Sequence, residues 1–183
     1  MKLKERPEKS KARISEIFTG LYEANLKKLY RYIYYRVRDV NVTEDLTATV
    51  FEKALKKFNR YSADKASFST WLFAIARNTL VDFYRKSSRE VTTATEVTSV
   101  ANPHGQVSHG TDEVFKNEEL QRLFLYLSGL SDLEQEIISL KFGSGLTNRE
   151  IARLHRLSES NVGTVLYRAI RKLRAKFLED ENG

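Results

Sequence analysis

Apolar residues recur at intervals of three and four positions along most of this chain, which is the period of an α-helix. Only eight glycines and two prolines interrupt its 183 residues, and strand-like alternation is scarce. The one long exception is residues 87–112, which are rich in Ser, Thr and Val and carry turn signals. A structureless loop of that length is uncommon inside a compact domain, so we interpret it as a flexible linker. The sequence therefore predicts an all-α protein with two small helical domains, at residues 10–86 and 113–178.

Helix boundaries can be predicted from the same pattern. Three helices are expected in the first domain and four in the second, at residues 11–38, 43–58 and 69–86, and at 113–127, 132–142, 148–154 and 159–178. Asn41 or Thr43 is expected to cap the second helix, with acidic residues beside its positive end. Ser131 and Thr147 each begin a capping box with a glutamate three residues later, and Ser158 is a further N-cap.

The charge of the chain is positive and unevenly distributed. Lys and Arg outnumber Asp and Glu by 31 to 24, which gives a net charge of +7. Residues 1–86 carry +9, residues 87–112 carry −2, and residues 149–177 carry +6. Two electropositive regions on either side of a weakly acidic segment predict a polyanionic partner, such as nucleic acid.

Several classes of protein are excluded or disfavoured by composition. The chain has no cysteine, so disulfide scaffolds, cysteine-ligated metals and thiol catalysis are excluded, and a cytoplasmic location is expected. No apolar stretch approaches the roughly 20 residues that span a bilayer, so no membrane insertion is expected. His104, His109 and His155 lack a metal-binding spacing, and residues 143–145 lack the lysine of a phosphate loop. We therefore expect no metal, no cofactor and no catalytic residue.

Residues 147–177 have the order of a helix-turn-helix motif: a short capped helix, a turn and a longer basic helix. The longer helix is expected to bury Val162, Leu166, Ala169 or Ile170, Leu173 and Phe177. Its opposite face is predicted to enter the major groove of duplex DNA, through Ser160, Asn161, Thr164, Tyr167, Arg168, Arg171 and Lys172. A solvated basic face on an ordinary bundle helix is the alternative, and the concentration of positive charge favours DNA binding.

Aromatic and basic side chains interleave in the segment from residue 60 to residue 86. The aromatic residues are Tyr61, Phe68, Trp71, Phe73, Phe83 and Tyr84, and the basic residues are Arg60, Lys65, Arg77, Arg85 and Lys86. Single-stranded nucleic acid can stack its bases on such rings while the cations neutralise its phosphates. An aromatic core is the competing interpretation, and Leu72, Ile75 and Phe83 are expected to belong to that core.

Three strings in the sequence resemble the extracytoplasmic-function (ECF, group 4) sigma factors of the sigma-70 family. They are TEDLTATVFEKALKKF, SFSTWLFAIARNTLVDFYRK and LTNREIARLHRLSESNVGTVLYRAIRKL, and the resemblance extends from about Phe18 to Phe177. The string FSTWL-x-x-IARN is the most specific of its features. The resemblance implies a bacterial factor that binds core RNA polymerase and directs promoter-specific initiation of transcription, with no catalysis of its own.

The resemblance also implies a role for each half of the chain. The first half is similar to sigma region 2, which docks on the β′ clamp helices of polymerase and melts the −10 element. A flipped-out base would be captured by the loop Tyr61–Phe68, which includes Ser62, Ala63, Asp64 and Lys65, by neighbouring Trp71 and by Asn78. Arg77, Arg85 and Lys86 would hold the neighbouring backbone. The second half is similar to region 4, which reads the −35 element and sits on the β flap, while the linker threads through polymerase. An anti-sigma factor is a further candidate partner.

The chain departs from the family pattern at two surfaces. Asp45 and Phe51 fit the polymerase-binding pattern, but Ala48 and Thr49 stand where the family often has Gln and Glu. In the recognition helix, basic residues are replaced by Gly163, Val165 and Ile170. We therefore expect weak or unusual recognition of the −35 element, because losing phosphate contacts lowers affinity.

A free-standing helix-turn-helix regulator is the alternative function. Its first 86 residues would then be a sensor or a dimerisation module, and it would bind an operator tightly without polymerase, as a dimer on paired half-sites. The FSTWL-x-x-IARN string argues against this alternative, because a sensor has no need of that sequence.

Overall fold

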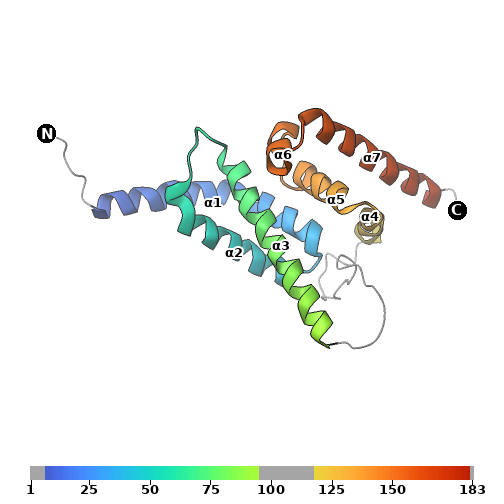
Figure 1. Cartoon of the computed structure of the whole chain (residues 1–183), viewed down its shortest axis with the longest axis horizontal. Coiled ribbons are helices and arrows are strands. Elements are labelled where there is room, and N and C mark those ends of the chain that lie inside the picture. The colour runs from blue at the N-terminus through green and yellow to red at the C-terminus, as the bar shows by residue number, and fades with distance from the viewer. Residues whose placement is uncertain (1–6, 95–117, 182–183) are drawn as a thin grey trace.

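The structure, a computed structural model, describes the backbone of residues 7–94 and 118–181 and the side chains of residues 14–88 and 121–180. All regular elements in these ranges are helical, as predicted. Figure 1 shows the helices in two groups, α1 to α3 and α4 to α7. The part of the predicted linker from residue 95 to residue 112 lies outside the described residues.

The first group contains α1 (Pro7–Val37), α2 (Val40–Lys57), the short 3-10 helix η1 (Phe58–Arg60) and α3 (Phe68–Ala94). The prediction that Asn41 or Thr43 caps α2 is wrong. The cap is Asp39, whose carboxylate accepts a hydrogen bond from the Val42 backbone N–H at 2.9 Å. Arg38 has a left-handed φ of 56°, which turns the chain so sharply that α2 begins only two residues later.

The end of α3 also differs from the prediction. The helix was expected to stop at Lys86, but it continues to Ala94, so residues 87–94 belong to the helix and not to a linker. These residues contain neither glycine nor proline. An established helix meets nothing there that would end it, even though Ser, Thr and Val are only moderate helix formers.

The second group contains α4 (Glu118–Ser128), α5 (Asp132–Ile138), the π-helical turn η3 (Ser139–Gly143), α6 (Asn148–His155) and α7 (Glu159–Glu181). Both predicted capping boxes are present, at Ser131 and at Thr147. The Ser158 hydroxyl caps α7 by accepting the Asn161 N–H at 3.1 Å. The helix predicted over residues 132–142 changes to a π-turn after Ile138, where the Ser144 N–H donates to the Ser139 carbonyl five residues earlier.

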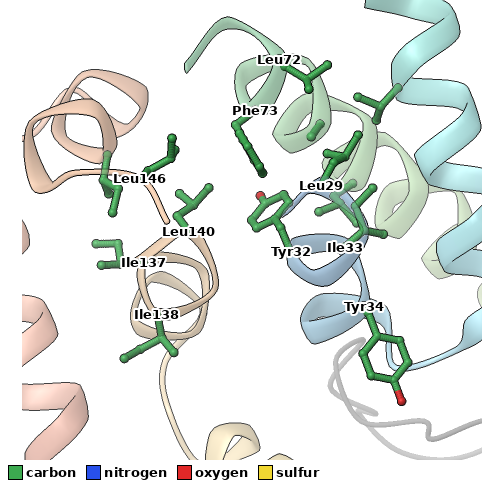
Figure 2. Packing of buried hydrophobic residues seen from close by; sticks show 14 of the residues in the cluster. Leu29, Tyr32, Ile33, Tyr34, Leu72, Phe73, Ile137, Ile138, Leu140 and Leu146 are labelled. Carbon is green, nitrogen blue, oxygen red and sulfur yellow. The ribbon is translucent and has the colours of Figure 1, made fainter. Parts of the chain in front are cut away.

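The buried side chains of the two groups form one continuous cluster. Leu29 and Ile33 of α1 pack with Leu72 and Phe73 of α3, and Ile137 and Leu140 lie on the other side of the cluster. Figure 2 shows Tyr32 of α1 facing Leu140 of η3 across the boundary between the groups. Phe124 of α4 extends this contact, with its ring 5.7 Å from that of Tyr34. The two halves of the chain are therefore packed against each other through apolar side chains.

Candidate nucleic-acid interface

The loop before α3 rests on a cluster of aromatic rings. Tyr61 stacks on Phe58, with ring centroids 5.9 Å apart, and lies 5.3 Å from Trp71. Phe68 sits beneath both and is only 5% exposed. Tyr61 and Trp71 remain half-buried, so each has an accessible portion. Both interpretations of these aromatic residues therefore hold in part. Phe68 belongs to the core, while Tyr61 and Trp71 reach the surface, where bases could stack on them.

The polar members of the predicted single-strand site lie in the loop before α3 and along α3 itself. A turn closed by the Lys65 N–H to the Ser62 carbonyl, at 3.1 Å, shapes the loop. Ser62 is half-buried, whereas Ala63, Asp64 and Lys65 are exposed. On α3, Asn78 is exposed and follows the half-buried Arg77, and Arg85 and Lys86 are exposed further along the helix. We call Tyr61, residues 62–65, Trp71, Arg77 and Asn78 the strand face.

Arg77 and Arg85 already have acidic neighbours. Arg77 Nε lies 3.0 Å from Glu136 Oε1 as an ion pair, although the pair lacks hydrogen-bond geometry. Arg85 lies 3.8 Å from Asp82, one turn earlier on α3, and both side chains are well exposed. The sequence did not predict a role for Glu136. The available signal was a carboxylate directly before the apolar pair Ile137 and Ile138.

The recognition helix α7 presents the predicted polar face. All seven predicted duplex-binding side chains are exposed: Ser160, Asn161, Thr164, Tyr167, Arg168, Arg171 and Lys172. Val162, Leu166 and Ala169 are buried as predicted, and Leu173 is half-buried. The alternative position Ile170 is 45% exposed. The prediction that Phe177 is buried is wrong, because its side chain is 41% exposed, although its ring packs 4.6 Å from that of Tyr126.

Lys172 differs from the other members of this face. Its ammonium donates to both carboxylate oxygens of Glu134 on α5, at 2.8 and 3.0 Å. Burial by itself would raise the pKa of Glu134, but hydrogen bonds from Lys172 and Ser131 outweigh it and leave that pKa lowered. Lys172 is therefore bound to α5, and it is less available to phosphates than Arg168 or Arg171.

Two of the four predicted polymerase-binding residues, Ala48 and Phe51, line a groove between α1 and α2. The groove has a volume of about 590 Å³ and is mainly apolar. Its walls include Tyr22, Leu26 and Tyr30 of α1, together with Ala48 and Phe51 of α2. Asp45 is exposed and Thr49 is half-buried nearby, while Phe51 is 5% exposed and packs its ring 4.4 Å from that of Tyr22. Small Ala48 leaves the groove open where a longer side chain would fill it.

Two carboxylates of the second half contact the first half. Besides Arg77, Glu136 receives a long hydrogen bond of 3.5 Å from the Tyr32 hydroxyl. His155 Nε2 lies 3.6 Å from the same Oε1 atom of Glu136. Burial lowers the pKa of His155, and the nearby Glu136 only partly opposes this effect. Glu150 accepts hydrogen bonds from the Ser67 and Thr70 hydroxyls at the start of α3, at 2.8 and 3.1 Å.

Within residues 7–94 and 118–181, no helix combines the length and apolar character that a membrane span requires. In the same residues, no three His, Asp or Glu side chains converge in a way that could hold a metal ion.

Two sequence families match the two halves of the chain. The family described as Sigma-70 region 2 matches residues 21–90, and the family described as Sigma-70, region 4 matches residues 120–173. The two matches follow in this order and cover the helices that carry both candidate surfaces. The chain belongs to the sigma-70 family.

Several of its relatives in the sigma-70 family are named as ECF factors. The chain is 33% identical over 177 residues to the ECF RNA polymerase sigma factor BldN of Streptomyces coelicolor, covering 95% of this chain and 65% of that protein. It is 28% identical over 163 residues to the ECF RNA polymerase sigma factor SigX of Bacillus subtilis, covering 88% of this chain and 84% of SigX. The predicted resemblance is thus confirmed at the level of an ECF factor of the sigma-70 family.

Two solved structures have a similar fold. The sigma factor RpoE of Bartonella quintana, in complex with the anti-sigma factor NepR, gives a TM-score of 0.68 at 23% identity, over 88% of this chain and 97% of RpoE. CnrH, in complex with the cytosolic domain of CnrY, gives 0.62 at 21% identity, over 94% of this chain and 91% of CnrH. The predicted all-α fold with region 2 and region 4 domains is confirmed.

Proposed function

We propose that this chain is a group 4 ECF sigma factor, which binds core RNA polymerase and directs it to specific promoters. The observation that carries the proposal is the succession, in one chain, of a region 2 match and a region 4 match. Named relatives with the ECF label support the same function. The chain would act as an initiation factor in the cytoplasm and catalyse no reaction itself.

In this proposal each half takes one promoter element. The domain at residues 10–86 melts the −10 element and the domain at residues 113–178 contacts the −35 element. Asn78 and the loop at residues 61–68 hold an extruded base, because loop backbone and aromatic rings can compensate the unstacking of a base. Arg77, Arg85 and Lys86 neutralise the neighbouring phosphates.

Recognition of the −35 element by α7 is expected to be weak. Ser160, Asn161 and Thr164 can offer short hydrogen-bonding groups to base edges, and Arg168 and Arg171 can reach phosphates. The positions of Gly163, Val165 and Ile170 add no cation, so few phosphates are neutralised and the affinity for duplex DNA alone is low.

Polymerase contacts are proposed at two surfaces. The α1–α2 groove, with Ala48 and Phe51 in its α2 wall, receives the β′ clamp helices, and Asp45 and Thr49 of α2 add contacts beside it. Region 4 contacts the β flap. By likeness to RpoE with NepR and to CnrH with CnrY, an anti-sigma factor is a third proposed partner.

Run-off transcription with bacterial core polymerase tests this function. Core enzyme plus the full chain should start transcripts at promoters selected from a random DNA pool, and core enzyme alone should not. Tight binding of duplex DNA without polymerase, together with no stimulated transcription, would instead support the free-standing regulator, which the named relatives do not favour.

A further inference from the structure

Thr164 occupies the centre of the exposed face of α7. Its neighbours on that face, three or four residues away in either direction, are also exposed: Ser160, Asn161, Tyr167 and Arg168. The buried side chains of the same stretch lie on the opposite side of the helix: Val162, Leu166 and Ala169. When this face enters a major groove, Thr164 is therefore the side chain directed most squarely at the base pairs.

The hydroxyl of Thr164 is used within the helix itself. It donates to the Ser160 carbonyl, four residues earlier, at 3.0 Å. This bond holds the hydroxyl oxygen against the backbone of the preceding turn. The oxygen and the methyl group are both attached to Cβ and point in different directions, so the methyl group is left as the outer part of the side chain. Thr164 therefore offers a methyl group at the centre of the face, and its one hydroxyl proton is already engaged.

Gly163 leaves space open beside this methyl group. A Cβ atom there would meet no atom closer than Asn148 Nδ2 at 3.9 Å, so packing within the described part of the protein does not require a glycine. The missing side chain instead allows the backbone of α7 to approach a ligand closely on this side. Tyr167, which is 65% exposed, borders Thr164 about one turn further along. The three residues give the centre of a polar and basic face an apolar character.

We propose that Thr164 is a specificity-determining residue, whose methyl group recognises the C5-methyl group of a thymine in the −35 element. Among the four bases of unmodified DNA, only thymine presents a methyl group in the major groove. Contact between the two methyl groups removes apolar surface from water, and the other three bases offer no such contact. The inference rests on the proposed function, because it takes the −35 element as the DNA that α7 contacts.

The test uses two variants of Thr164 that separate its two groups. Thr164→Ser keeps the hydroxyl and removes the methyl group, whereas Thr164→Val keeps a methyl group and removes the hydroxyl. Serine and valine have helix propensities close to that of threonine, so α7 should remain folded in both variants. Thr19→Ser on α1 is the matched control, because Thr19 is also exposed and its hydroxyl also donates to a carbonyl four residues earlier, that of Ser15, at 2.9 Å.

Binding is measured with core polymerase and the full chain, and the probe is a promoter selected from a random DNA pool. Each thymine of its −35 element, on either strand, is replaced in turn by uracil, which removes only the C5-methyl group. At one thymine we expect wild type to lose about fourfold in affinity, the factor that corresponds to burial of one methyl group. Thr164→Val and Thr19→Ser should show the same loss, whereas Thr164→Ser should bind the thymine and uracil promoters equally.

A second measurement returns the methyl group on a different base. The same thymine is replaced by cytosine or by 5-methylcytosine, each paired with guanine. Methylation of this cytosine should strengthen binding by wild type and by Thr164→Val, and it should leave binding by Thr164→Ser unchanged. The reverse pattern, in which Thr164→Ser behaves like wild type and Thr164→Val does not respond, would show that the hydroxyl reads the DNA and would overturn the proposal.

Run-off transcription distinguishes failure of this proposal from failure of the proposed function. If wild type directs transcription but Thr164→Ser responds to every uracil as wild type does, the function stands and methyl recognition is wrong. If no protein stimulates transcription, the uracil scan is repeated on duplex DNA selected by the full chain alone. A loss that depends on the Thr164 methyl group would then support methyl recognition and contradict the proposed function, and the absence of such a loss would overturn both.

Discussion

Asn78 and Arg168 are exposed side chains on two different helices, and each tests one half of the promoter contact. Asn78→Ala removes a polar group from the strand face, so we expect open-complex formation to fall about tenfold or more while closed-complex binding is kept. Arg168→Ala should weaken binding to upstream duplex DNA and leave melting of bound promoter intact. Permanganate reactivity of unpaired thymines and gel shifts measure the two steps. The reverse pattern would contradict the assigned roles.

Lys172 and Arg171 are neighbours on α7 that should behave differently. Arg171→Ala should reduce the slope of log affinity against log salt by about 1, because one phosphate contact is lost. Lys172→Ala should leave that slope nearly unchanged, since its ammonium is bound to Glu134. It should instead lower the free energy of unfolding by up to about 1 kcal/mol, as its side chain is 57% exposed. Equal salt slopes for the two variants would contradict this distinction.

His155 makes stability depend on pH in a defined direction. Burial lowers its pKa in the folded protein, so the unfolded chain binds the proton more readily. The free energy of unfolding should therefore be highest above about pH 6.5 and fall as the pH decreases below that value. The pKa values of Glu134 and Glu150 are lowered, so these groups change stability only as the pH falls below the ordinary pKa of glutamate. They do not affect the pH range in which His155 gains its proton.

The measurement for His155 is the urea midpoint at about pH 7.5 and about pH 5.5, on either side of its ordinary pKa. We expect wild type to lose stability between these two values and His155→Gln to lose much less. An equal loss in both proteins would show that another group is responsible.

At the scale of elements, two glycines distinguish helix propensity from backbone strain. Gly163 lies within α7, and a Cβ there would meet no atom closer than Asn148 Nδ2 at 3.9 Å. Gly163→Ala should therefore raise the free energy of unfolding by up to about 1 kcal/mol. Gly145 has a φ of +73°, a backbone conformation that residues with a side chain rarely adopt. Gly145→Ala should therefore lower the free energy of unfolding, even though no atom lies within 4 Å of the added Cβ. Chemical denaturation measures both, and a destabilised Gly163→Ala would contradict the expected gain.

At the scale of the whole molecule, the continuous core predicts cooperative unfolding. Buried residues from both halves belong to one cluster, with Tyr32 and Leu140 at the junction. We expect a single calorimetric transition whose van't Hoff and calorimetric enthalpies agree. Gly143→Val should split or broaden this transition, because a Cβ at Gly143 of η3 would stand 3.0 Å from Tyr35 Cδ2 and 3.4 Å from Tyr32 Cα of α1 and would strain the junction. Two resolved transitions in wild type would show that the halves unfold independently.

Much of this molecule follows from local sequence alone. The helical period, the capping boxes at Ser131 and Thr147 and the buried stripe of α7 depend on residues within one or two turns of each other. Side chains at such short separations are positioned by the backbone of a single helix, so the local residue pattern is enough to predict the caps and the buried face. The exposed face of α7 is predictable for the same reason.

Other features arise only when distant segments meet. The cap of α2 depends on the left-handed turn at Arg38, and the burial of Arg38 beside Phe124 involves residues far apart in the chain. The roles of Glu136 and Glu150 require α5 and α6 to lie against α3, which no local period encodes. A carboxylate on a helix looks the same in sequence whether water or an arginine faces it. Its partner is selected by packing across the whole core, and that packing turns two predicted separate domains into one closed molecule.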